Sequence, residues 1–99
     1  MYQEPWSDIK DYPSAHRLAL ESELKKELSK GHVLFGLHIE VLAKREDNDD
    51  ILVSTDQGYF IVHLTWSGKQ EKEPFPSIDH FESVEKLKIK LASDSDFYS

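Results

Sequence analysis

The sequence predicts a single α+β domain, a two-layer sandwich in the order helix, three-strand antiparallel meander, helix. Three observations favour this fold. The chain has 99 residues, enough for one hydrophobic core but not for two. Apolar residues recur at helical spacing before residue 31 and after residue 78. From residue 37 onward the apolar spacing changes to alternation, which is typical of half-buried strands.

Residues 1–13 are expected to form an extended lead-in, followed by a helix from Ser14 to about Lys30. Ser14 is a suitable N-terminal cap, and Gly31 is expected to end the helix because glycine tolerates the left-handed conformation found there. The apolar stripe of this helix consists of Ala15, Leu20, Leu24 and Leu28.

Three strands are expected next, over residues 37–44, 51–55 and 59–66. The first strand should direct Leu37, Ile39, Val41 and Ala43 to one face. The third strand is the clearest, because its even positions are all large and apolar: Phe60, Val62, Leu64 and Trp66. We expect both helices to cover this even face of the sheet.

A second helix is predicted after residue 78, where Asp79 and Glu82 resemble a capping box. Its inward residues would be Phe81, Val84, Leu87 and Leu91. The alternation over residues 87–91 also permits a short strand, and residues 93–99 are expected to fray.

The charge balance bears on partners. Asp and Glu number 19 and Lys and Arg number 12, so the net charge is −7 with histidine neutral. Nucleic acid is a poor ligand for such a chain, whereas a basic protein is a suitable one. Cysteine is absent, so the chain has no disulfide framework and no thiolate site. Because no signal peptide and no apolar run of about 20 residues is found, we expect a cytoplasmic protein without membrane association.

The material for catalysis or metal binding is limited to His32, His38, His63 and the carboxylates of residues 46–50. A calcium loop fails, because Leu52 and Gly58 stand where its glycine and glutamate are required. A triad of His63 and Asp56 with Ser54 or Ser67 lacks the strand-turn-helix elbow of a nucleophile. We therefore expect no catalytic residue, no metal and no cofactor.

Partner binding is the better use of the remaining signals. The acidic turn is either a solvated hairpin tip or an anionic knob for a basic partner. Trp66 either anchors the loop that follows or forms an aromatic contact beside two glutamates. The predicted partner-binding residues are Asp47, Asp49, Asp50, His63, Trp66, Glu71 and Glu73.

Three segments are distinctive: GHVLFG at residues 31–36, AKREDNDDIL at 43–52 and VHLTWSG at 62–68. Over about residues 17–82 the chain resembles small bacterial proteins with an HLTWSG motif, some of which resemble immunity proteins of contact-dependent growth inhibition systems. The resemblance implies a monomer that binds and neutralises a basic toxin domain, a nuclease, in the cytoplasm. It implies no catalytic residue. Two alternatives stay open: a binding or scaffold domain without a toxin partner, and a small hydrolase that uses His63 and Asp50.

Overall fold

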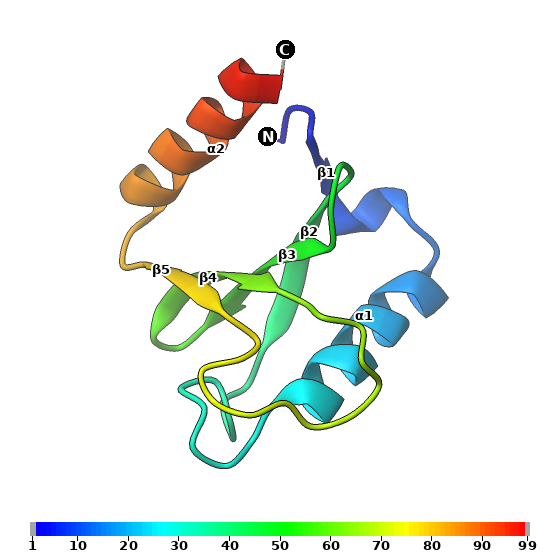
Figure 1. The fold of residues 1–99 in the computed structure, drawn as a ribbon. Helices are drawn as coiled ribbons and strands as arrows, with labels where there is room; N and C mark the ends of the chain where they lie inside the picture. Colours follow the sequence, from blue (N-terminus) through cyan, green and yellow to red (C-terminus); the bar gives the residue numbers. More distant parts are fainter. Residues whose placement is uncertain (1, 99) are drawn as a thin grey trace.

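The computed structural model describes residues 2–98, which form an antiparallel sheet with one helix on each face (Figure 1). The five strands lie in sequence order across the sheet. The elements are β1 (Trp6–Asp8), the 3-10 turn η1 (Ile9–Asp11), α1 (Ser14–Glu27), β2 (Glu40–Arg45), β3 (Asp50–Thr55), β4 (Gly58–His63), β5 (Ile78–Phe81) and α2 (Val84–Tyr98).

The α+β class is confirmed, but the predicted three-strand meander is the centre of a longer one. Part of the expected lead-in forms β1, which pairs with β2. The segment predicted to begin the second helix forms β5, which pairs with β4. Helix α2 begins only at Val84, where Ser83 Oγ accepts a hydrogen bond from the backbone N–H of Lys86 at 3.3 Å. Both added strands are too short to show a period in the sequence.

The expectation that both helices cover one face is wrong. The face with Phe60 and Val62 packs against α1, as predicted, through Leu20, Leu24 and Leu28. Leu87 of α2 instead packs on the other face, which carries Trp6, Ala43, Leu52 and Ile61. β3 is buried on both faces, as a strand between two helical layers must be.

An irregularity in β2 separates residues that simple alternation would place together. Val41 pairs with Val53, but Ala43 pairs with Leu52, so Leu42 is an extra residue in the ladder. Such a bulge reverses the facing of the strand beyond it. Val41 therefore belongs to the α1 face and Ala43 to the α2 face, contrary to the predicted single face.

Both helix ends differ from the expected boundaries. α1 ends at Glu27, and Leu28 is already extended, so Gly31 is not its stop signal. Pro13, rather than Ser14, occupies the N-terminal cap position, and it makes no side-chain cap hydrogen bond. α2 continues to Tyr98 through a segment expected to fray, and Asp94 in this segment is buried.

Candidate partner-binding site

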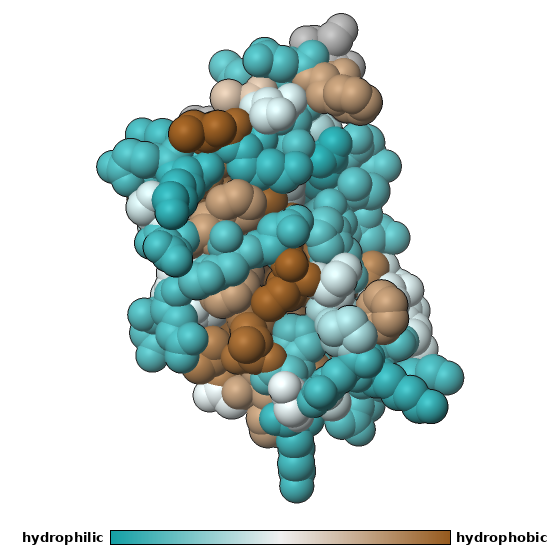
Figure 2. Space-filling view, turned by 60° about the vertical axis from the view of Figure 1, so that its left-hand side comes forward, coloured by the Kyte–Doolittle hydropathy of each residue, from teal (hydrophilic) through white to brown (hydrophobic). Residues whose placement is uncertain are grey.

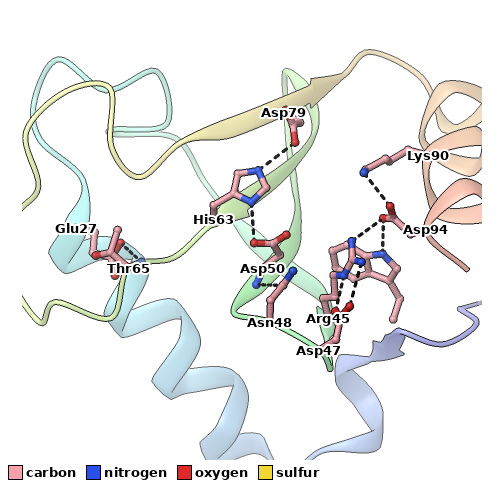
Figure 3. Close-up of polar contacts among 11 residues, drawn as sticks. Glu27, Arg45, Asp47, Asn48, Asp50, His63, Thr65, Asp79, Lys90 and Asp94 are labelled. Atoms are coloured by element: carbon pink, nitrogen blue, oxygen red, sulfur yellow. Dashed lines mark hydrogen bonds and ion pairs between the residues drawn. The ribbon is translucent and has the colours of Figure 1, made fainter. Parts of the chain in front are cut away.

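The loop after β4 is attached to α1 by a buried glutamate. Glu27 Oε1 accepts the backbone N–H of Thr65 at 3.0 Å (Figure 3), and its Oε2 accepts that of Trp66 at 2.8 Å. Glu23 Oε2, one turn earlier, accepts the N–H of Gly68 at 3.0 Å. Glu27 is 0% exposed and Glu23 is also buried. The two carboxylates therefore take the place of water as acceptors for three backbone N–H groups of the loop.

Two further contacts attach the loop to the end of α1 and to itself. The backbone N–H of Glu71 donates to the carbonyl oxygen of Glu27 at 3.0 Å, and Thr65 Oγ1 donates to Glu71 Oε1 at 3.2 Å. The first and last residues of the segment 65–71 are therefore both hydrogen-bonded to Glu27, at the end of α1. Because these contacts already restrict the conformation of the loop, less conformational entropy is lost when a partner binds to it.

Trp66 is the exposed centre of this loop. It was predicted to be buried at the end of the third strand, but β4 stops at His63 and Trp66 is 43% exposed. Its φ of 57° is in the left-handed region, which costs a non-glycine residue about 1–2 kcal/mol. The hydrogen bond that the backbone N–H of Trp66 donates to Glu27 offsets this cost.

The pKa values of the two glutamates move in opposite directions. Burial, together with the hydrogen bond between the two carboxyl groups, raises the pKa of Glu27, although the loop amides oppose this shift. The same hydrogen bond lowers the pKa of Glu23. The pair therefore ionises in sequence, with Glu23 losing its proton first.

His63, at the end of β4, lies between two aspartates from neighbouring strands. Its Nδ1 is 2.7 Å from Asp50 Oδ1 on β3, and its Nε2 is 3.1 Å from Asp79 Oδ2 on β5 (Figure 3). Asp50 is its direct partner across the β3–β4 ladder. Burial works against protonation of the ring, but the hydrogen bonds and charges of the two aspartates outweigh it and raise the pKa of His63.

This geometry limits the chemistry of His63. Both ring nitrogens face carboxylate oxygens, which only accept hydrogen bonds, so the arrangement suits the doubly protonated imidazolium. A general base needs a ring nitrogen free to take a proton. In this arrangement His63 is an ion-paired residue, and Asp50 holds it in place rather than activating it.

A second polar group lies beneath α2. Asp94, which is 6% exposed, accepts hydrogen bonds from Trp6 Nε1 at 3.0 Å and from Lys90 Nζ at 2.8 Å. Arg45 Nη1 lies 3.3 Å from the same carboxylate, and its Nε binds Asp47. Burial opposes ionisation of Asp94, but Lys90, Trp6 and Arg45 together lower its pKa. The bulge in β2 places Arg45 on this face.

The structure brings some of the predicted partner-binding residues together and separates others. Asp50 contacts His63, and Glu71 shares the tethered loop with Trp66. Asp47 is paired with Arg45, whereas Asp49 is exposed. Glu73 is exposed and lies directly over Gly31.

The structure also gives a role to His32. It is buried, its Nδ1 accepts the backbone N–H of Leu34 at 3.1 Å, and its Nε2 is 2.7 Å from the carbonyl oxygen of Pro76. The carbonyl is an acceptor only, so Nε2 carries the proton and the ring is neutral. His32 is a structural link between the loop before β2 and the loop before β5.

Sequence reasoning missed Glu23, Glu27 and Asp94. A signal was present: Glu23 and Glu27 are three and seven residues after Leu20, on the same helix face as Leu24. Charged residues inside an apolar stripe are buried, and a buried carboxylate requires partners. Asp94 likewise follows Leu87 by seven residues.

Within residues 2–98, no group of three or more His, Cys, Asp or Glu residues is arranged to hold a metal ion. Neither of the described helices has the length and apolar character needed to cross a membrane. No protein-family model, curated protein or solved structure matches this chain.

Proposed function

We propose that this protein is an immunity protein that binds a bacterial toxin domain and neutralises it by covering the toxin's active site. The proposal joins the resemblance carried by the HLTWSG segment to the properties of the surface that this segment forms. On this proposal the toxin domain is basic, a nuclease, and is met in the cytoplasm by a monomer of this chain. No catalytic role is assigned to any residue.

The presentation of Trp66 is the observation that carries the proposal. The loop is held on α1 by two buried glutamates, yet its largest apolar side chain is exposed. A loop needed only for folding would gain stability by burying the indole. Exposed tryptophan on a rigid support is typical of the residues that dominate protein–protein binding energy.

The charge of the chain supports a basic partner. Its net charge is −7; Glu71 lies within the tethered loop, Glu73 follows it by two residues, and Asp50 pairs with His63 at the end of β4. A nuclease cleft is basic because it must hold phosphates. Carboxylates of an inhibitor accelerate encounter with such a cleft and align the two proteins.

The test is to search the neighbouring genes for one that encodes a large exported toxin, to co-express its C-terminal domain with this protein, and to titrate the purified domain. We expect Trp66→Ala to weaken binding by about 30-fold or more, as loss of a central aromatic contact does, and to abolish protection. Phe97→Ala is the matched control, because Phe97 is also an exposed aromatic residue, 90% exposed, but lies at the far end of α2. Equal binding by both variants would reject this surface.

A charge reversal provides a second arm. Asp49→Lys removes an exposed acid of the turn between β2 and β3, whereas Asp56→Lys makes the same change in the turn at the other end of β3. We expect Asp49→Lys to slow association several-fold at low salt and Asp56→Lys to have little effect. If the wild-type protein neither binds nor protects, the alternative of a binding domain without a toxin partner replaces the proposal.

A further inference from the structure

The outer edge of β5 is unpaired among residues 2–98, because β5 is the last strand of the sheet. The backbone N–H of His63 donates to the carbonyl oxygen of Ser77 at 2.9 Å. This bond shows which residues of β5 direct their backbone groups toward β4. With Ile61 opposite Asp79, the antiparallel pattern directs the backbone groups of Asp79 and Phe81 toward β4. The backbone N–H and C=O groups of Ile78 and His80 therefore point outward.

The surface around this edge is accessible and acidic. Asp79 and His80 are exposed, and Figure 2 shows apolar side chains bordered by hydrophilic ones on the side of the molecule where β5 lies in Figure 1. Residues 73–85 contain four acids and no lysine or arginine. The acids are Glu73, Asp79, Glu82 and Glu85, of which Asp79 also pairs with His63 at 3.1 Å and Glu82 with Lys86 at 3.7 Å.

A cleft of about 210 Å³ opens beside the first residue of β5. Its lining consists of Gly31, His32, Val33, Glu73, Pro74 and Ile78. Glu73 reaches into it over Gly31, at a place where any larger residue would meet its carboxylate. Apolar walls with one carboxylate fit a lysine or arginine side chain, whose aliphatic stem and charged end need both.

We propose that the outer edge of β5 accepts an extended, lysine- or arginine-bearing segment of the protein partner as an additional strand. The backbone groups of Ile78 and His80 would pair with this segment. The residue opposite Ile78 shares its face of the sheet and would place its side chain in the cleft. This inference rests on the proposed function, because it assigns to the toxin domain the segment that binds.

The acidity of the edge argues against a second copy of this chain as the occupant. A two-fold pairing of β5 with β5 through the outward backbone groups of Ile78 and His80 would place Asp79 opposite Asp79 of the other copy. Like charges placed opposite each other across two strands are destabilising. A basic strand meets the same carboxylates with opposite charge.

The experiment uses the full chain and a phage-displayed library of random nine-residue peptides as the probe, so it does not need the toxin. We expect enrichment of extended sequences with lysine or arginine, and binding that shifts and protects the amide protons of Ile78 and His80. His80→Pro removes the outward N–H, and proline is tolerated on an edge strand. His80→Ala is the matched control, because both variants lose the ring that stacks on Phe60 at 4.5 Å.

We expect His80→Pro to weaken peptide binding by about ten-fold or more relative to His80→Ala, since one backbone hydrogen bond is lost. Glu73→Gln should remove the preference for lysine or arginine without removing binding. The proposal is overturned if no such peptides are enriched, if both His80 variants bind equally, or if the chain dimerises through β5. The co-expression test judges the proposed function separately, since protection does not depend on which edge is used.

Discussion

Each helix carries a buried carboxylate that joins distant parts of the chain, Glu27 on α1 and Asp94 on α2, and these two are stabilised in different ways. Glu27 of α1 accepts hydrogen bonds from the backbone of the loop after β4. Asp94 of α2 is surrounded by side chains, namely Trp6, Lys90 and Arg45. Backbone amides do not titrate and cannot be moved far, whereas charged side chains can turn toward solvent. The α1 side is therefore the rigid one, and it presents the Trp66 loop.

Removal of Glu27 should have the largest effect. Glu27→Ala leaves the amides of Thr65 and Trp66 without an acceptor and creates a cavity at a 0% exposed position. We expect a loss of about 2–4 kcal/mol in the free energy of unfolding, measured by urea denaturation. Glu27→Gln keeps an oxygen for one amide and should lose roughly half as much. A loss below that of Asp94→Ala would contradict the comparison.

Removal of Asp94 should cost less, although Asp94 is also buried. Asp94→Ala leaves the indole N–H of Trp6 without an acceptor. Arg45 keeps its ion pair with Asp47, and the ammonium group of Lys90 can be hydrated instead. We expect a loss of about 2 kcal/mol in urea denaturation. Asp94→Asn retains an acceptor for Trp6, so its loss should be smaller. Equal losses for the two variants would show that the ion pairs, not the indole, carry the stability.

The two carboxylates should respond to pH in opposite directions. The pKa of Glu27 is raised above 4.5 in the folded state, so stability should rise as pH falls through that raised value toward 4.5. The pKa of Asp94 is lowered below 3.8, so its contribution is present above 3.8 and is lost as pH falls through the folded value. We expect the urea midpoint of Glu27→Gln to lack the rise that the wild type shows as pH falls toward 4.5. The midpoint of Asp94→Asn should lack the fall that the wild type shows below pH 3.8. Unchanged slopes would show that other groups carry the pH dependence.

The sequence predicted the parts of the fold that have a period. β3, β4 and α1 show alternation or helical spacing over several residues; Phe60 and Val62 of β4, and Leu64 just after it, are buried as expected. The edge strands β1 and β5 have three and four residues, too few for a pattern. The bulge at Leu42 is likewise invisible, because a single extra residue leaves no mark in composition.

The residues of the candidate site could be predicted only from distinctive sequence motifs. The HLTWSG segment and the acidic turn drew attention to His63 and Trp66, but hydrogen bonds between residues 27 and 66 depend on the tertiary fold. Trp66 was expected to continue a strand because it follows Leu64 by two residues. It turns outward because the buried Glu27 binds its backbone N–H, a competition that spacing along the chain does not reveal.

The smallest effect concerns His63, which belongs to neither helix and is 38% exposed at its side chain. Its pKa is raised above 6.5 in the folded state, so its stabilising contribution is complete below pH 6.5 and is lost as pH rises through the folded value. Solvent screening keeps this change small. Urea midpoints from pH 6 to 9 should decline slightly in the wild type and stay flat in His63→Gln. The decline should also shrink at high salt, because it depends on the charges of Asp50 and Asp79. A wild-type midpoint that rises over this range would contradict the ion-paired arrangement and return His63 to the status of a neutral, available base.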